Sequence, residues 1–185
     1  MGRNLRLGLQ WISTESDRVA AYHKAVDQVR YATERERRAA ASIGEIHAGA
    51  ATLATSLAQS VAQRETQSLR ELESHYRAVT GSATPARPAG GDVERQLMAL
   101  RPAIAAGPRE FLDGRGTIAG VAGLHGLMGF ELLNFIDGRR NGLEIYRHLA
   151  AEAREAGDHY FGIVTPAAVL QYLNNAATAR MIRTR

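Results

Sequence analysis

The longest uninterrupted pattern in this sequence is helical. Residues 15–79 contain no proline, and apolar side chains recur there at steps of three and four. Val19, Tyr22, Val26 and Val29 fall on one helix face at this spacing, and charged side chains occupy the opposite face. A proline-free amphipathic stretch of this length predicts one broken helix or a helical hairpin.

The break in this stretch is expected near Ser42. Its hydroxyl is a candidate N-cap, and Glu45 three residues later would complete a capping box. The second helix would then pack through a stripe of larger residues: Ile46, Leu53, Leu57, Val61, Leu69, Leu72 and Tyr76. Small side chains dominate residues 48–62, which allows two helices to approach closely. The sequence therefore predicts an antiparallel hairpin.

A linker follows the hairpin. Residues 80–91 are composed almost entirely of Gly, Ala, Pro, Ser and Thr, which is typical of a connecting segment. We therefore divide the chain into a helical hairpin over residues 1–79, a linker over residues 80–91, and a C-terminal module over residues 92–185.

The C-terminal module alternates apolar helical runs with capping residues. Helices are predicted from Asp92 to near Pro102, over 124–136, from Asn141 to 155, and after the Thr165 cap with Pro166 at its first position. Residues 160–164 and 179–184 are predicted as short strands. The expected fold class is thus mainly α, with a long N-terminal helical hairpin and a small winged-helix-like C-terminal module containing short β strands.

Composition removes several kinds of chemistry. The chain has no cysteine, which excludes disulfides, thiolate metal sites and a cysteine nucleophile. The net charge of +4 is diffuse, because residues 15–79 carry nine basic and nine acidic side chains and residues 122–185 carry seven and six. Phosphate binding needs clustered positive charge, so this distribution does not favour nucleic acid as the partner.

No motif completes a catalytic, cofactor or metal site. The six histidines form no His-x-x-x-His pair, and His23 with Asp27 supplies only two ligands on one helix face. His125 and His148 could meet in the C-terminal core as structural residues. The letters from Gly114 to Ala119 match a dinucleotide pattern, but no strand precedes them, so we interpret them as a glycine-rich turn. We therefore predict a non-enzyme without catalytic residues, cofactor or metal.

Membrane association and secretion are not expected either. The N-terminus has no apolar run of signal-peptide length, and the least polar stretch, residues 39–63, contains Glu45, His47 and many small polar residues. We recognise no targeting signal in the sequence, so the cytoplasm is the default expectation.

A winged-helix-like pattern suggests DNA binding, and the predicted helix after Thr165 tests this interpretation. Residues 165–179 contain no charged side chain, although Gln171, Asn174 and Asn175 could contact bases. Phosphate contacts, which set the register of such a helix, would have to come from the last arginines of the chain, Arg180, Arg183 and Arg185.

Four segments of the C-terminal module resemble a helical extension found at the C-terminus of some bacterial di-zinc aminopeptidases of the leucyl aminopeptidase class. They are GPREFLDG at 107–114, ELLNFIDGRR at 131–140, LEI at 143–145 and VTPAAVLQYL at 164–173. The stretch from Trp11 to Val19 is similar to the end of such a catalytic domain, but no histidine stands where the family has a metal ligand.

The resemblance implies a non-catalytic packing or protein-interaction module that lacks the metal site, with a catalytic domain or another protein as partner. Self-association through the hairpin is compatible with it, and a longer parent protein could be a zinc aminopeptidase. The alternative is a winged-helix nucleic-acid-binding regulator in which the hairpin is a dimerisation arm. A peptide-binding adaptor is a third reading that the sequence does not separate from the first.

Overall fold

The computed structural model describes residues 14–185, apart from the side chains of Ala48 and Asp158. The chain divides into two compact units, one ending at Pro88 and one beginning at Ala89. The division falls inside the segment that we interpret as a linker. The first three residues of the stretch from Trp11 to Val19, which resembles the end of a catalytic domain, lie outside the described residues.

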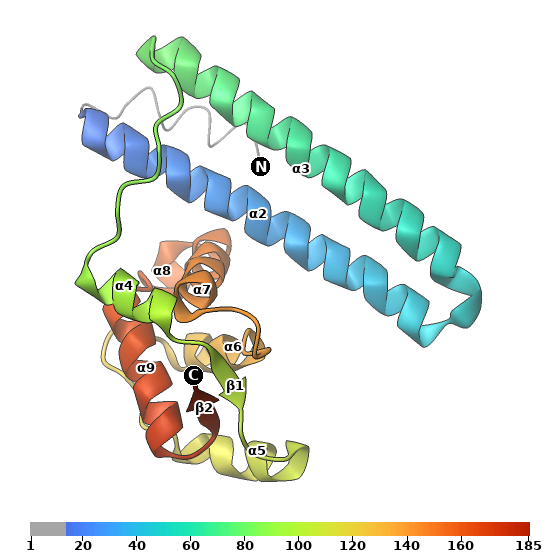
Figure 1. Cartoon of the computed structure of the whole chain (residues 1–185), viewed down its shortest axis with the longest axis vertical. Coiled ribbons are helices and arrows are strands. Elements are labelled where there is room, and N and C mark those ends of the chain that lie inside the picture. The colour runs from blue at the N-terminus through green and yellow to red at the C-terminus, as the bar shows by residue number, and fades with distance from the viewer. Residues whose placement is uncertain (1–13) are drawn as a thin grey trace. The chain divides into compact units, whose positions relative to one another are not determined.

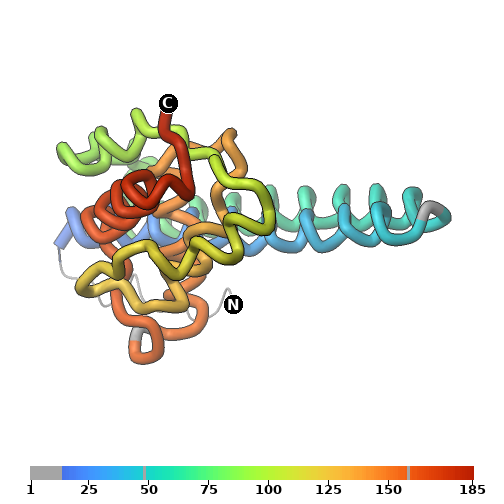
Figure 2. The backbone as a smooth tube through the Cα atoms, turned by 90° about the horizontal axis from the view of Figure 1, so that it is seen from below, coloured from blue at the N-terminus to red at the C-terminus, as the bar shows by residue number. Residues whose placement is uncertain are grey.

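The first unit is an antiparallel pair of long helices, α2 (Glu15–Ile46) and α3 (Ala51–Thr80), joined by the short 3-10 helix η1 (Ala48–Ala50). Figures 1 and 2 both show α2 and α3 side by side along their length. Thr14 caps the start of α2, because its hydroxyl oxygen accepts a hydrogen bond of 3.2 Å from the backbone N–H of Asp17. Gly81 ends α3 in the left-handed conformation with a φ of 69°.

The predicted helix break at Ser42 is wrong. α2 continues to Ile46, and the Ser42 hydroxyl donates to the carbonyl of Ala39 at 2.8 Å, a bond within the helix. Gly44 is part of α2, and α3 lies close to it, since a Cβ on Gly44 would lie 3.3 Å from the Cβ of Ala54. The turn forms at His47 instead, where the backbone becomes extended.

Leu69 in the predicted packing stripe is half-buried, and the other six residues divide into two groups. Val61, Leu72 and Tyr76 are buried as expected, and Leu72 forms a small core with Ala25 and Val26. Ile46, Leu53 and Leu57 are exposed, so their predicted packing inside the hairpin is wrong. Small residues bring the two helices together near the turn, which leaves the larger side chains outside the seam.

The second unit contains six helices, one 3-10 helix and two strands. They are α4 (Asp92–Ala99), β1 (Pro102–Ile104), α5 (Pro108–Gly114), η2 (Arg115–Thr117), α6 (Gly126–Asn134), α7 (Gly142–Ala156), α8 (Asp158–Phe161), α9 (Pro166–Thr178) and β2 (Ile182–Thr184). The strands pair antiparallel with Ile104 opposite Ile182. The predicted fold class, mainly α with an N-terminal hairpin and short strands in the C-terminal part, is confirmed.

Two helix starts in this unit follow the capping residues seen in the sequence. The Asn141 side chain accepts from the N–H of Glu144 at 2.9 Å, and the Glu144 carboxylate accepts from the N–H of Asn141 at 2.8 Å. Thr165 accepts from the N–H of Ala168 at 3.2 Å, with Pro166 at the first helical position. Both predicted starts are confirmed.

The predicted strands were only half right. Residues 160–164 form no strand, since Tyr160 and Phe161 end α8 and Gly162 turns the chain with a φ of 72°. The terminal strand exists as β2, shorter than predicted. Its partner β1 follows directly after α4 and was not expected.

The core of the second unit lies among α4, α7 and α9, which pack against one another. Leu97, Ile145, Leu149, Val169 and Leu173 are fully buried there. Within residues 14–185, no helix combines the length and apolar character that crossing a lipid bilayer requires.

Candidate interaction surface

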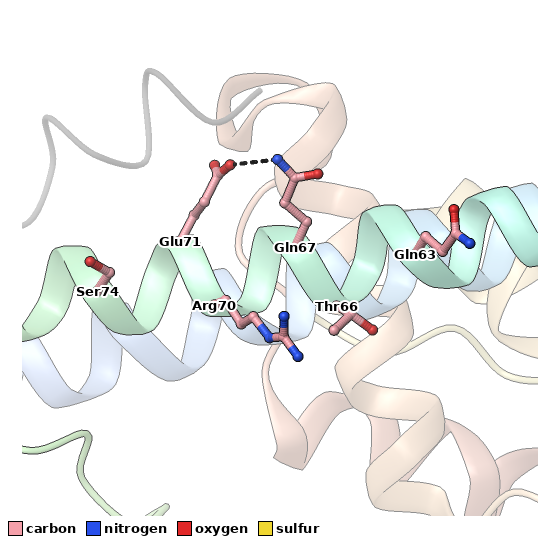
Figure 3. Close-up of a pocket in the computed structure, with 6 residues that line it drawn as sticks. All are labelled: Gln63, Thr66, Gln67, Arg70, Glu71 and Ser74. Atoms are coloured by element: carbon pink, nitrogen blue, oxygen red, sulfur yellow. Dashed lines mark hydrogen bonds between the residues drawn. The ribbon is translucent and has the colours of Figure 1, made fainter.

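The hollow shown in Figure 3 runs along one helix. All of its lining residues belong to α3: Gln63, Thr66, Gln67, Arg70, Glu71 and Ser74. Within the hollow, the amide of Gln67 donates to the Glu71 carboxylate at 3.2 Å. The lining holds one carboxylate and no histidine to serve as its acid–base partner. This surface can offer hydrogen bonds to a partner, but it brings together no reacting groups.

The histidines are engaged with different neighbours. His125 is the N-cap of α6, where its Nδ1 accepts from the N–H of Leu127 at 3.2 Å, and its ring contacts the edge of Phe161. His148 instead stacks on Phe135 at a centroid distance of 5.6 Å. The two rings that we expected could meet therefore have separate aromatic partners. In the part of the chain that the structure describes, no three His, Asp or Glu side chains are grouped to hold a metal ion.

The glycine pattern at Gly114 has the wrong surroundings for a dinucleotide. Gly114 is the last residue of α5, and Gly116 lies in η2. A dinucleotide-binding loop instead connects a strand to the N-terminus of a helix, where the pyrophosphate binds. These glycines thus lie at the wrong end of their helix for that role.

The amides proposed to contact bases are not equally available. The side chain of Asn175 donates to the carbonyl of Ala119 at 2.9 Å, so it helps to hold α9 on the loop before α6. Gln171 and Asn174 are exposed on α9. Arg180, Arg183 and Arg185 are also exposed, in or beside β2.

A group of apolar side chains in the second unit is open to solvent. We call four of them the aromatic patch. They come from α6 and from the segment around α8: Leu127, Phe130, Tyr160 and Ile163. Tyr160 and Ile163 are 62% and 72% exposed, respectively. Such exposure of large apolar side chains from neighbouring segments is typical of a surface that binds another protein.

Ring contacts link residues at each end of the aromatic patch to their neighbours. The His125 ring, next to the start of α6, lies 5.4 Å from the ring of Phe161, and Phe161 lies 4.6 Å from Tyr160. At the other end, the guanidinium carbon of Arg115 lies 4.9 Å above the ring of Phe130. Since Leu127 and Phe130 are three residues apart, they share one face of α6.

The aromatic patch was not predicted from the sequence, although one signal was present. The predicted helix over 124–136 is apolar on more than one face, and a helix needs only one face for its core. Met128, Leu132 and Leu133 turn inward and are buried, whereas Leu127 and Phe130 are left outside. Tyr160 and Ile163 were not expected in a patch, because residues 160–164 were predicted to form a strand.

Two tyrosines have shifted titration. Burial raises the pKa of Tyr172 above its ordinary value, and a Cβ on Gly129 would lie 3.0 Å from the Tyr172 ring, so α6 and α9 are close at this point. Burial, assisted by the charge of Glu73, also raises the pKa of Tyr22. Both shifts favour the neutral phenol.

Comparison of the chain with known protein families, with curated proteins and with solved structures finds no match.

Proposed function

We propose that this protein is a non-catalytic interaction module whose second unit docks onto another protein through the aromatic patch. The observation that carries the proposal is the exposure of Tyr160 and Ile163 near α8, together with the exposure of Leu127 and Phe130 on α6. Tyrosine, phenylalanine and arginine are enriched at the centres of protein–protein interfaces, and buried aromatic anchors supply much of the binding energy.

The core beneath the patch supports this role. α6 places Met128 and Leu132 in the interior and Leu127 and Phe130 outside, so one rigid helix both anchors the patch and presents it. An interface on a rigid element loses less conformational freedom on binding than one on a loop. The sequence resemblance described above supplies the class of partner, which is the catalytic domain of a di-zinc leucyl aminopeptidase.

Isothermal titration calorimetry can test this proposal with the catalytic domain of a bacterial di-zinc leucyl aminopeptidase that lacks its own C-terminal extension. We expect binding in the micromolar range. The double variant Tyr160→Ser, Ile163→Ser should weaken it at least about tenfold, because it removes two anchors. The control is Met98→Ser, at an apolar residue on α4 outside the patch that is 55% exposed, and it should leave binding unchanged.

A second measurement addresses the non-catalytic part of the proposal. Purified protein supplied with zinc or cobalt should not hydrolyse a leucyl-anilide above the buffer blank. Turnover that disappears on chelation would contradict the non-catalytic part. The docking part would be contradicted if the catalytic domain does not bind, or if it binds the patch variant as tightly as the native chain.

Nucleic-acid binding by the second unit is the other candidate function. The exposed arginines Arg180, Arg183 and Arg185 stand close together in the chain beside α9, on which Gln171 and Asn174 are exposed. Binding of duplex DNA that weakens with rising salt, and weakens further in the variant Arg180→Gln, Arg183→Gln, would favour this function over docking. DNA binding that changes neither with salt nor in this variant would count against a nucleic-acid-binding function.

A further inference from the structure

The two-stranded sheet brings together arginines that lie far apart in the sequence. β1 and β2 lie side by side in Figure 1, and their pairing continues one residue beyond the strands. There Arg101 and Arg185 exchange two backbone hydrogen bonds, of 3.1 and 3.3 Å, so the two residues are directly opposite each other. Arg183 points to the same side of the sheet, because side chains alternate along a strand. We call this side, with its three arginines, the arginine face.

The arginine face is the side of the sheet that turns away from the core. Pro102 and Ile182, whose side chains point to the opposite side, are buried. Arg101, Arg183 and Arg185 are all exposed. The burial pattern and the alternation along the strands therefore agree on where the three side chains lie.

The arginine face lacks an acidic counterpart in the part of the chain that the structure describes. Within residues 14–185, none of its three guanidinium groups forms an ion pair with an aspartate or a glutamate. Asp137, in the loop beside β1, is engaged by Arg140 at 3.0 Å and by two backbone N–H groups. Like charges at directly opposite positions destabilise a sheet, and an anion bound between Arg101 and Arg185 would remove that repulsion.

The loop between α6 and α7 holds one of these arginines in place. A guanidinium nitrogen of Arg101 donates to the carbonyl oxygen of Arg139 at 2.7 Å. A Cβ on Gly138 would lie 3.4 Å from the Cβ of Ala103, so this loop packs beside β1. A guanidinium group has five N–H donors, so this bond leaves Arg101 with donors for an anion. Arg139 is itself exposed and adds a fourth positive charge next to the face.

We propose that the arginine face binds the phosphate backbone of a nucleic-acid duplex without reading its sequence. The planar guanidinium group fits phosphate oxygens through paired hydrogen bonds, and backbone binding requires clustered positive charge. Charge that is diffuse along the chain is concentrated here by the pairing of β1 with β2. The inference goes beyond docking at the aromatic patch. It also differs from the nucleic-acid alternative above, because it assigns the contact to the sheet and not to α9.

Two other kinds of polyanion fit this face less well. Single strands are held largely by stacking of their bases on aromatic rings, whereas among residues 101–103 and 183–185 the face carries only Ala103 besides the arginines. An acidic protein segment would normally add apolar or aromatic anchors at the centre of the interface, and the arginine face offers it no such contact. Contacts to the backbone of a duplex need only cations.

Fluorescence anisotropy with a labelled DNA duplex of about 20 base pairs and mixed sequence tests the proposal. With three or four phosphate contacts, the logarithm of the binding constant should fall against the logarithm of salt concentration with a slope of about −3. The dissociation constant should be on the order of 10 µM at about 50 mM salt. The variant Arg101→Gln, Arg185→Gln should weaken binding at least about tenfold and make the slope shallower by about two.

Two matched variants separate the site from the loss of charge. Arg70→Gln, Arg109→Gln removes the same charge at exposed arginines of α3 and α5 and should bind like the native chain. Arg101→Lys, Arg185→Lys keeps the charge and should keep most of the binding and the native salt slope. Circular dichroism of Arg101→Gln, Arg185→Gln should give a thermal midpoint close to that of the native chain, which shows that the variant is folded.

Four results would overturn the proposal. They are no binding of the duplex at up to about 200 µM protein, binding that is unchanged in Arg101→Gln, Arg185→Gln, tighter binding of the single strand than of the duplex, and displacement of the duplex by polyglutamate at equal charge. A loss of binding in Gln171→Ala, Asn174→Ala as large as that in Arg101→Gln, Arg185→Gln would also overturn it, in favour of α9.

Docking at the aromatic patch and binding at the arginine face fail separately. The variant Tyr160→Ser, Ile163→Ser should bind the duplex like the native chain. Arg101→Gln, Arg185→Gln should bind the aminopeptidase catalytic domain like the native chain. Loss of duplex binding with catalytic-domain binding intact therefore supports the arginine face without bearing on the aromatic patch.

Discussion

The hairpin and the C-terminal unit are both helical, but they hold together by different means. In the C-terminal unit a continuous core of nineteen buried residues collects side chains from α4, α6, α7, α9, β2 and the loops between them. The described part of the hairpin has a core cluster of only three buried residues, Ala25, Val26 and Leu72. Elsewhere the hairpin relies on small-residue contacts and on ion pairs along and between its helices.

This difference separates two ways of specifying a helix. The hairpin helices are encoded mainly by local features, including high helix propensity and pairs four residues apart such as Glu34 with Arg38. The short helices of the C-terminal unit would not be stable in isolation, and burial of their apolar faces stabilises them. Substitutions of the same kind should therefore have unequal effects in the two units.

The largest expected effect comes from removing a core leucine. Leu149→Ala should lower the free energy of unfolding of the C-terminal unit by about 2–5 kcal/mol, because Leu149 is fully buried and the cavity cannot be filled. Leu57→Ala, at an exposed residue of α3 in the hairpin, should cost less than about 1 kcal/mol. Urea unfolding followed by circular dichroism measures both. Equal losses would contradict the contrast between the units.

An intermediate effect on stability is expected at Gly142, because the start of α7 has no space for a side chain there. A Cβ on Gly142 would lie 2.9 Å from the carbonyl oxygen of Leu97 and 3.3 Å from Leu173, so Gly142→Ala should destabilise the C-terminal unit by about 1–3 kcal/mol. Gly116→Ala is the control, because a Cβ there meets nothing within 4 Å. Its midpoint in thermal unfolding should stay close to that of the native chain. A neutral Gly142→Ala would mean that α4 and α7 are packed less tightly than described.

The smallest effect concerns the segment that leaves the hairpin. The Arg87 guanidinium binds the Asp27 carboxylate on α2 through two hydrogen bonds, of 2.6 and 3.1 Å. The pair is partly exposed, so Arg87→Gln should cost less than about 1 kcal/mol of global stability. Locally it should free the chain around Pro85 and Pro88.

Limited digestion with a nonspecific protease detects this release. We expect the first cut of the native chain near these prolines and a severalfold faster cut in Arg87→Gln. Arg109→Gln is the control, since Arg109 is exposed and pairs only with Asp113 on its own helix. Early cleavage inside residues 122–178 would contradict the idea that the connecting segment is the weakest point of the backbone.

Much of the fold was predictable because it is encoded over a few residues. Asn141 with Glu144, and Thr165 with Pro166, start their helices through contacts that span three positions, and both starts were predicted correctly. The two candidate surfaces could not be predicted in the same way. Leu127 and Leu132 both lie in the apolar run of α6, yet one is exposed and the other fully buried.

The sequence by itself determined where most helices lie, since capping, propensity and periodicity act within about four residues of the chain. Tertiary structure alone decided that β1 pairs with β2, that Arg87 reaches Asp27 across 60 residues, and which leucines face water. These outcomes depend on which segments meet in space. Close contact at small residues such as Gly44 and Ala54 then determines which larger neighbours remain outside.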